Sequence, residues 1–415
     1  MQFYHALGAI MTDKTFIRDL DVKNKKVLMR VDFNVPLDDQ GRITDATRIQ
    51  AALPSIQHLL NNDAAVILMS HMGRPKGKVD PSLSLKPCAE KLSEFLEIPV
   101  NIAPDCVGSG AKKFVSELKP GEVLLLENLR FHKAEENPDL DPNFAKELAS
   151  FADIYINEAF GTAHRKHASN VAITQFFPEK AASGFLMEKE IAFLGQSILH
   201  PEHPFFALIG GAKISSKIGV MLALIDKVDG ILVGGGMAFT FLKAKGISIG
   251  NSIVEEDYIE TAKEIIAKCE KNKVKLILPL DLVVADKFDN NANSQVIETS
   301  QGVPEGHMGL DIGPQTLKEF ESVLQNARII LWNGPMGVFE MVKFARGTFK
   351  MAEILASVDG TTVVGGGDSI AAINASGLSH RFSHLSTGGG ACLEYIEHGK
   401  LPAIEALSCS KSVRS

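Results

Sequence analysis

The sequence is poor in side chains that bind nucleic acids. It has one Trp and four Tyr among 415 residues, which leaves little aromatic surface for stacking on single-stranded bases. Its formal net charge is -7, so it lacks the positive excess that general nucleic-acid binding requires. We therefore expect no nucleic-acid partner, and any anion site has to be local.

Cysteine and long apolar runs are also scarce. The five cysteines are scattered and form no CxxC pair, which argues against a disulfide framework or a zinc site. No uncharged apolar run approaches the roughly 18 residues of a membrane helix. Residues 1–10 make a poor signal peptide because they lack Lys and Arg. These absences predict a cytoplasmic protein without a membrane partner. The cysteines are Cys88, Cys106, Cys269, Cys392 and Cys409.

Motifs of several enzyme classes are missing as well. No G-x-x-x-x-G-K-[ST] occurs, which excludes a P-loop enzyme, and no G-x-G-x-x-G with a later acidic residue supports a nicotinamide site. No G-x-S-x-G surrounds a serine, so nucleophilic hydrolysis has no support. His71, His164 and His167 lack the spacing and the partners of a metal site.

What the chain does contain is a regular alternation of apolar strands and helical patterns. Its length and its 45% of hydrophobic residues allow two or three domains with real cores. The alternation predicts an α/β fold with mainly parallel sheets, in which ligands bind beyond the carboxyl ends of the strands. In the first half the predicted strands are 26–31, 65–70, 122–127 and 153–157, and the predicted helices are 46–60, 86–96 and 144–151.

Basic and hydrogen-bonding side chains follow these strands. Arg or His comes after three of the four strands, and Arg48 opens the first long helix. If they converge on one crevice, the guanidinium groups bind carboxylate or phosphate in bidentate fashion, which we favour over a merely solvated face. Asp32 and Asn34 would bond a substrate hydroxyl or hold an arginine. The remaining members of this predicted anion site are His71, Arg74, Arg130 and Arg165.

The second half repeats the alternation, but glycine replaces the basic residues. Backbone amides and glycine suit a nucleotide, whose phosphates and flat base need close approach. Pro279 and Asp281 are expected at the same edge of the sheet, after the third strand. The predicted strands are 205–209, 230–233, 274–278, 328–332 and 361–364, and the glycine turns are 210–213, 234–236, 333–337, 365–369 and 386–390.

The most informative stretch is 361–373, where a strand, three glycines and the start of a helix follow one another. A phosphate can approach such a turn closely and is attracted by the helix N-terminus. Asp368 would hold a Mg²⁺ bound to that phosphate, or cap the helix. Lys213 and Lys217 are predicted to begin a helix and project from one face toward a phosphoryl group, or to be an ordinary solvated pair.

Together these stretches resemble the signature motifs of the phosphoglycerate kinase family. They occur in family order and cover about residues 13–408. The matching runs are 26–36, 70–75, 127–131, 157–165, 210–217, 234–241, 332–340, 365–369 and 386–390.

The resemblance implies two doubly wound, Rossmann-like parallel-sheet domains joined by a hinge. Residues 1–183 and a returning segment 399–415 would bind phosphoglycerate, and residues 184–398 the nucleotide. A family member is expected to be a cytosolic, monomeric glycolytic enzyme. It moves a phosphoryl group between 1,3-bisphosphoglycerate and ADP, giving 3-phosphoglycerate and Mg-ATP, so Mg²⁺ is the expected cofactor.

The family pattern also assigns individual residues. Glu340 would bind the ribose, and Asp368 the metal. The phosphoglycerate positions are Asp32, Asn34, Arg48, His71, Arg74, Arg130 and Arg165. The nucleotide positions are Gly211, Lys213, Gly235, Gly236, Asn333, Glu340, Gly365, Gly366, Gly367, Asp368 and Ser369. The residues assigned to catalysis are Arg48, Lys213, Lys217, Gly366 and Gly389.

Exchange between an acyl phosphate and a nucleotide removes no proton from a hydroxyl, so catalysis reduces to placement and charge neutralisation. Ligands on two domains imply closure, with hinge candidates in 183–196 and 395–399. The alternatives are a nicotinamide dehydrogenase and a two-domain binding protein for phosphorylated metabolites. The first lacks the dinucleotide motif, and the second does not need Lys213, Lys217 and Asp368 together. The first residue of the protein would be either Met1 or Met11. Neither residues 1–10 nor the tail 409–415 overlap any of the motifs.

Overall fold

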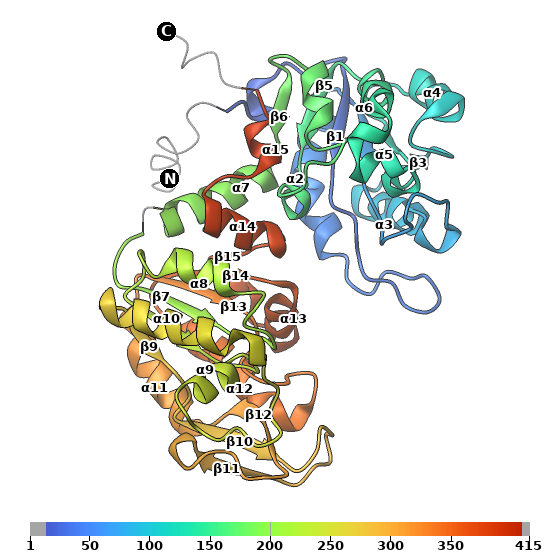
Figure 1. Ribbon diagram of the computed structural model, residues 1–415. Coiled ribbons are helices and arrows are strands. Elements are labelled where there is room, and N and C mark those ends of the chain that lie inside the picture. The colour runs from blue at the N-terminus through green and yellow to red at the C-terminus, as the bar shows by residue number, and fades with distance from the viewer. Residues whose placement is uncertain (1–13, 200, 409–415) are drawn as a thin grey trace. The chain divides into compact units, whose positions relative to one another are not determined.

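The computed structural model describes residues 14–199 and 201–408. Contacts within the chain divide it into two units (Figure 1). The first contains the residues up to Ala192 and those from Lys400, and the second is Phe193–Gly399. The predicted domain boundaries at 183/184 and 398/399 stay predictions. The segments 1–10 and 409–415, which overlap no motif, lie outside the described residues.

The first unit is built on a six-stranded parallel sheet with the strand order β3-β4-β2-β1-β5-β6. Four strands match the predicted ones to within two residues at each end. The other two, β3 and β6, have three residues each and are too short for an apolar pattern to reveal. The strands are β1 (Lys26–Arg30), β2 (Ala65–Met69), β3 (Val100–Ile102), β4 (Val123–Leu125), β5 (Ile154–Asn157) and β6 (Ala181–Ser183).

Helices cover both faces of this sheet, because successive side chains of a strand point to opposite faces. The covering helices are α2 (Thr47–Asn61), α3 (Lys86–Leu96), α4 (Gly108–Glu117) and α6 (Pro142–Ala149). Val27 and Met29 of β1 pack with buried residues of α2 and α3. Leu28, between them, packs in a second cluster with residues of α4 and α6. The unbroken apolar strands of the sequence therefore reflect a sheet that is buried on both faces.

The end of the described chain belongs to the first unit. After the short helix α15 (Pro402–Glu405), the N–H of Ser408 donates to the carbonyl of Ala181 at 2.9 Å. The carbonyl of Ser408 accepts from the N–H of Thr15 at 3.0 Å. Strand β6 is thus joined to segments near both ends of the described chain, an arrangement that no local pattern in the sequence indicates.

A buried carboxylate anchors the start of helix α7 (Phe185–Leu194). Glu158 accepts hydrogen bonds from the N–H of Leu186 at 3.0 Å and from the N–H of Met187 at 3.3 Å. Gly184 lies against this carboxylate, since a Cβ added there would be 2.1 Å from Oε2. Burial raises the pKa of Glu158 to about 7.

Glu158→Gln is expected to flatten the pH dependence of the free energy of unfolding. Because the folded-state pKa is raised from 4.5 to about 7, the contribution of Glu158 is fully present below the unfolded pKa and is lost as pH rises through 7. The pKa difference corresponds to about 3 kcal/mol, at about 1.4 kcal/mol per pKa unit. Urea unfolding between pH 5 and 8 measures it, with the exposed Glu117→Gln as the control. An unchanged slope in Glu158→Gln contradicts this account.

The second unit also has a six-stranded parallel sheet, with the order β15-β14-β13-β7-β8-β9. All five strands predicted for this half are present to within one residue at each end, and the two-residue β15 is the additional strand among the described residues of this sheet. The strands are β7 (Phe205–Ile209), β8 (Gly230–Val233), β9 (Lys275–Ile277), β13 (Ile329–Asn333), β14 (Thr361–Gly365) and β15 (His384–Leu385).

Seven helices follow or cover these strands. They are α8 (Ile218–Leu224), α9 (Ala238–Ala244), α10 (Ile259–Lys271), α11 (Pro314–Leu324), α12 (Arg346–Ser357), α13 (Gly367–Ser376) and α14 (Gly390–His398). Leu208 and Trp332 of the sheet pack with Phe320 of α11, Met351 of α12 and Ile373 of α13 in one core cluster. None of the helices in the described part of the chain has the length and apolar character to cross a membrane.

A second, antiparallel sheet of three strands interrupts the parallel pattern (Figure 1). Its strands, in the order β11-β10-β12, are β10 (Asp281–Ala285), β11 (Ser294–Glu298) and β12 (Met308–Ile312). The predicted place of Asp281 at the ligand edge stays a prediction. Its buried carboxylate accepts from the N–H groups of Gln315 at 2.9 Å and Thr316 at 2.8 Å, so it caps the start of α11.

Candidate active site

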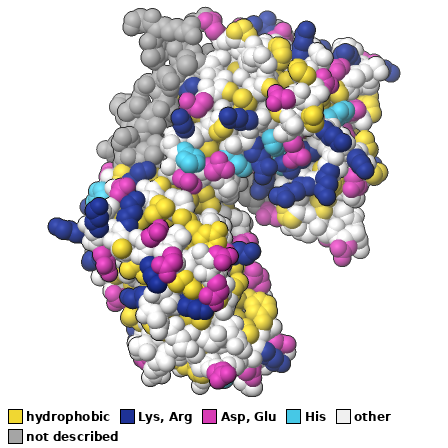
Figure 2. All heavy atoms as spheres, in the orientation of Figure 1, with side chains coloured by type: hydrophobic (Ala, Val, Ile, Leu, Met, Phe, Trp, Pro, Cys, Tyr) yellow, Lys and Arg dark blue, Asp and Glu magenta, His cyan; other side chains and the backbone are white. Residues whose placement is uncertain are grey.

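The predicted anion-site residues of the first unit lie beyond four neighbouring strands. Asp32 follows β1, His71 follows β2, Arg130 lies in a turn after β4, and Arg165 follows β5. Since β4, β2, β1 and β5 are adjacent and parallel, their carboxyl ends meet at one edge of the sheet. Figure 2 shows Lys and Arg side chains gathered in one area of this unit.

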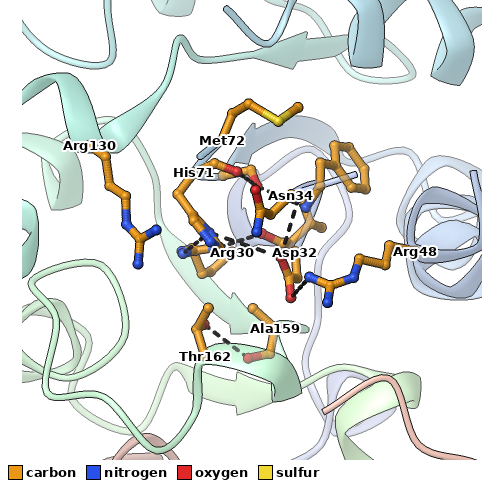
Figure 3. Close-up of polar contacts among 12 residues, drawn as sticks. Arg30, Asp32, Asn34, Arg48, His71, Met72, Arg130, Ala159 and Thr162 are labelled. Atoms are coloured by element: carbon orange, nitrogen blue, oxygen red, sulfur yellow. Dashed lines mark hydrogen bonds and ion pairs between the residues drawn. The ribbon is translucent and has the colours of Figure 1, made fainter. Parts of the chain in front are cut away.

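Asp32 holds Arg48 at this edge. Arg48 Nη1 donates to Asp32 Oδ2 at 2.7 Å from the first turn of α2, and Figure 3 shows the two side chains facing each other. The Arg48 side chain is 36% exposed, whereas that of Asp32 is 10% exposed. The carboxylate therefore orients the guanidinium while leaving part of it accessible to a ligand.

His71 is a buried, neutral member of the site. Its Nδ1 lies 3.2 Å from Nη2 of Arg30 and 3.9 Å from Oδ1 of Asp32. Burial, followed by the charges of Arg30, Arg130 and Arg48, holds the pKa of His71 well below 6.5. At neutral pH the imidazole is uncharged, so it can accept or donate a hydrogen bond without adding charge.

The turn that carries Arg74 is clamped at Gly73. The N–H of Gly73 donates to Asn34 Oδ1 at 2.9 Å, and its carbonyl accepts from Arg130 Nη1 at 2.7 Å. Gly73 has φ +57°, and a Cβ there would be 2.7 Å from a methyl carbon of Leu83. Two predicted site residues thus fix the backbone immediately before the exposed Arg74.

Positive charge accumulates on the far side of the same edge. Burial lowers the pKa of Arg130, the Glu136 carboxylate 3.2 Å from its Nε opposes this, and the charges of Arg30 and Arg165 lower the pKa further. His164 has its pKa lowered to about 4 by burial and then by Arg165. An anion bound at this edge would relieve the mutual repulsion of the guanidinium groups.

Sequence reasoning missed Arg30, which is fully buried behind these residues (Figure 3). Its Nε donates to Ser169 Oγ at 2.9 Å, and Ser169 Oγ in turn donates to Glu135 Oε1 at 2.7 Å. Nη2 of Arg30 lies 3.9 Å from Oε1 of Glu135. An arginine directly after the apolar residues 27–29 of β1 was the available signal.

In the second unit, five of the eleven predicted nucleotide residues line a cavity of 680 Å³. The six that do not line it are Lys213, Asn333, Gly365, Gly366, Gly367 and Ser369. Gly211, Gly235 and Gly236 form part of its wall, and Asp368 and Glu340 also line it. Most of its remaining lining is apolar, which suits the flat face of a base. The apolar lining includes Phe239, Ile253, Leu282, Phe288, Met308 and Val338.

Three glycine turns interlock at the carboxyl edge of this sheet, and we call them the glycine knot: residues 210–211, 234–236 and 334–336. The N–H of Gly211 donates to the carbonyl of Pro335, and the N–H of Gly235 to that of Met336, both at 2.9 Å. Gly235 has φ +65°, and a Cβ there would be 2.6 Å from the backbone nitrogen of Gly211. Side chains are excluded here by the backbones themselves.

The positions of Lys213 and Lys217 differ from the predicted ones on one face of a helix. Helix α8 begins at Ile218, so Lys213 and Lys217 do not share a helical face. In the turn before it, Glu255 accepts a hydrogen bond from the N–H of Ser215 at 2.9 Å. Lys213 is exposed, while Lys217 is half-buried, and its Nζ donates to Asn333 Oδ1 at the end of β13. Burial lowers the pKa of Lys217.

The N-terminus of α13 is open, as the sequence predicted. Its N-cap, Gly366, has φ 95° and no side chain, and Asp368 in the first turn is exposed. Gly365 ends the adjacent strand β14, and Gly367 is the first helical residue. Ser369 is buried, and its Oγ accepts a hydrogen bond from the N–H of Gly334 at 2.7 Å. Its hydroxyl therefore stabilises one turn of the glycine knot.

Two more groups lie near these elements. Gly389, with φ 47°, is the N-cap of α14, so a second helix N-terminus follows strand β15. Asp311, which the sequence analysis missed, lines the cavity and accepts from the N–H of Gly347 at 2.7 Å. A Cβ on Gly337 would be 2.2 Å from Asp311 Oδ1. Burial raises the pKa of Asp311 to about 7.

The two units together define a class of protein. A parallel α/β unit with an arginine-rich sheet edge, joined in one chain to another with a glycine-lined apolar cavity, is typical of enzymes that handle an anionic substrate and a nucleotide.

Comparison with known proteins identifies the family. The family model described as phosphoglycerate kinase matches residues 17–400. The phosphoglycerate kinase of Moorella thermoacetica is 53% identical over 395 residues, covering 95% of this chain and 99% of the relative. That of Pseudothermotoga lettingae is 50% identical over 398 residues, covering 96% and 99%. The solved structure of phosphoglycerate kinase from Coxiella burnetii has a TM-score of 0.84 and 37% identity, covering 95% of this chain and 98% of that one.

The chain belongs to the phosphoglycerate kinase family. It is an α/β kinase whose two six-stranded parallel sheets match solved structures of the family. The family, enzyme class and fold class predicted from the sequence are therefore confirmed. The kinase interpretation is supported over the two-domain binding protein.

Proposed function

We propose that this chain catalyses reversible phosphoryl transfer between 1,3-bisphosphoglycerate and Mg-ADP, giving 3-phosphoglycerate and Mg-ATP. The observation that supports the proposal most is that Arg48, Arg130 and Arg165 come after β1, β4 and β5, parallel strands of one sheet, in a member of this family. A three-carbon ligand with a carboxylate and a phosphate has the charges that such guanidinium groups bind.

In the first unit, the ligand's two anionic ends would be held by arginines. Arg74 and Arg165 are accessible to solvent, so their guanidinium groups can meet an incoming anion. Asp32 and Asn34 orient Arg48 and Gly73, and each has lone pairs to offer a substrate hydroxyl. The full set proposed for phosphoglycerate is Asp32, Asn34, Arg48, His71, Arg74, Arg130 and Arg165.

In the second unit, the base would occupy the apolar part of the cavity and the phosphates would lie at the open N-terminus of α13. Glu340, exposed at the rim, is placed to accept from ribose hydroxyls. The N–H groups that follow Gly366 and Gly389 supply neutralisation without a side chain. Lys213 and Lys217 would add the cationic charge.

Asp368 is a suitable ligand for the Mg²⁺ of the nucleotide. Its carboxylate is exposed, lines the cavity and is not the cap of α13, since Gly366 occupies that position. Hard oxygen donors of this kind are what Mg²⁺ takes, usually one or two from the protein with phosphate oxygens and waters. When bound, the ion would neutralise charge on the phosphates.

The chain's own residues supply placement and charge instead of a general base. The attacking oxygen of the nucleotide is already ionised, so no proton has to be removed, and the buried His71 stays neutral. Arg48 and Lys217 are proposed to neutralise the phosphoryl group while its charge is spread over the equatorial oxygens. Water exclusion during this step would prevent hydrolysis of the acyl phosphate.

A coupled assay tests the function directly. Purified protein is supplied with 3-phosphoglycerate, ATP and Mg²⁺, and formation of 1,3-bisphosphoglycerate is followed through its reduction by an added dehydrogenase. We expect turnover that requires all three components. Binding of both ligands without any turnover would instead favour the binding-protein alternative.

Arg74→Ala and Arg165→Ala are expected to weaken 3-phosphoglycerate binding by about tenfold or more while leaving ADP binding unchanged. A charge-assisted hydrogen bond contributes about 1.5–3 kcal/mol, and each variant removes such bonds from one ligand only. Isothermal titration with each ligand measures both effects. Arg42→Ala is the control, because Arg42 pairs with Asp38 in an exposed loop. An equal loss of ADP affinity would overturn the proposed division between the units.

Asp368→Asn is expected to keep the fold, to lower kcat by about a hundredfold, and to make nucleotide affinity less dependent on Mg²⁺. The amide keeps the shape of the side chain but removes the charge that the ion would meet. Titrating ADP with and without Mg²⁺ gives the affinity, and circular dichroism checks the fold. Unchanged turnover would remove Asp368 from the metal site.

The remaining expectations concern the cellular location, the oligomeric state, the partners and the domain boundaries. A cytoplasmic monomer without nucleic-acid or membrane partners fits the net charge of -7. The proposed domain boundaries remain 1–183 with 399–415, and 184–398.

A further inference from the structure

Asp105, Cys106 and His132 lie together in the first unit, outside the residues described above. Asp105 and Cys106 are in the loop between β3 and α4, and His132 precedes the short helix α5 (Lys133–Glu136) (Figure 1). One ligand atom of each residue lies within 4.8 Å of those of the other two. The sequence shows no CxxC pair, and the fold replaces that signal by joining segments 26 residues apart.

We infer that these three side chains form a site for a zinc-like divalent transition metal. A thiolate, an imidazole and a carboxylate are the donors that Zn²⁺ takes, with water in the fourth position. Tetrahedral Zn²⁺ with bonds of about 2.0–2.3 Å spaces its ligand atoms about 3.3–3.8 Å apart, so the observed spacing requires a small adjustment. This site is separate from the proposed Mg²⁺ ligand Asp368.

The geometry allows entry from solvent and retention inside. The side chains of Asp105 and His132 are 44% and 32% exposed, whereas Cys106 is fully buried. His132 Nε2 lies 2.7 Å from Asp105 Oδ1, and its ring is stacked on Phe144 with centroids 5.3 Å apart. Two ligands therefore face water in a fixed orientation, and the thiol lies behind them.

The local charge favours a dication. The hydrogen bond to Asp105, followed by the charges of Asp105, Glu147 and Asp141, raises the pKa of His132. Burial, followed by the charges of Asp105 and Glu135, raises the pKa of the Cys106 thiol. Lys112, paired with Glu147 at 2.9 Å, partly offsets this field. A bound metal would replace these protons: the Cys106 thiol releases one to solvent on becoming a thiolate, and a protonated His132 releases another.

Co²⁺ is the probe, because thiolate ligation gives it a charge-transfer absorption that carboxylate and imidazole ligation do not. The full chain, stripped with a chelator and free of Mg²⁺ and nucleotide, is titrated with CoCl₂. Zn²⁺ stoichiometry is then measured by competition with a chromophoric chelator. We expect one Zn²⁺ per chain and a thiolate band that Zn²⁺ abolishes.

Variants decide whether the band arises at this site. Cys106→Ser should abolish it, and His132→Gln, which keeps the thiol and a half-exposed position, should weaken metal affinity at least tenfold. Cys269→Ser, which alters a buried cysteine of the second unit, is the matched control and should retain the band. Absence of the band in the unaltered chain, or its persistence in Cys106→Ser, would overturn the site and leave Asp105 and His132 as an ion pair only. Should Cys106→Ser fail to fold, the metal affinity of His132→Gln decides, and an unchanged affinity overturns the site.

Discussion

Arg48→Ala is expected to lower kcat by about 10³–10⁵-fold while changing the dissociation constants of 3-phosphoglycerate and ADP far less. Arg48 forms an ion pair with Asp32, but 36% of its side chain is exposed. The ion pair therefore orients the guanidinium and leaves part of it free to contact a ligand. We propose that it meets the phosphoryl group midway, when neither ground state fully holds the charge. An interaction made mainly in the transition state appears in kcat and not in affinity.

Arg48→Lys separates charge from shape. An ammonium supplies the charge but not the planar fork, so we expect only part of the lost turnover to return. Isothermal titration of both substrates, set beside steady-state turnover, measures the two effects. If affinity and turnover fall in proportion in Arg48→Ala, Arg48 is a plain substrate anchor.

Lys217→Ala is expected to lower kcat by about 10²–10³-fold, the usual cost of removing one positioned group that stabilises transition-state charge. Lys217 is half-buried and donates to Asn333, which fixes its Nζ at the end of β13. Asp368 is close enough to favour its charged form. The lysine is therefore positioned in advance, and little reorganisation is needed during transfer.

Two comparisons isolate this role. Lys217→Met keeps most of the aliphatic stem and should be as inactive as Lys217→Ala, because charge is the missing element. Lys227→Ala removes another half-buried lysine of the same unit and should leave turnover unchanged. Circular dichroism checks that each variant is folded. Near-normal kcat in Lys217→Met would show that the ammonium is dispensable.

The parallel sheets could be predicted because their central strands are unbroken apolar runs. Strands such as β7 and β8 are buried on both faces, so the sequence marks them without ambiguity. The antiparallel sheet was missed because β11 is mostly exposed and has no apolar run. The capping role of Asp281 depends on a helix 33 residues later, which no local pattern reveals.

The sequence allowed the residues of the candidate site to be predicted, but not the hydrogen bonds and ion pairs that they form with one another. The order of residues after each strand placed Asp32, His71 and Arg130 at one edge, since parallel strands bring their carboxyl ends together. Which groups bond to one another could not be read in the same way. Arg30 and Asp311 lie inside the fold, and their roles depend on contacts made between distant segments.

The glycine knot has a thermodynamic consequence. Its turns are tied by backbone hydrogen bonds and fit together only without side chains, so part of the cavity wall is shaped when the chain folds. A nucleotide that enters such a site does not have to order this segment, and little conformational entropy is lost there on binding. The glycine residues thus lose their conformational entropy when the chain folds, and this loss does not recur each time a nucleotide binds.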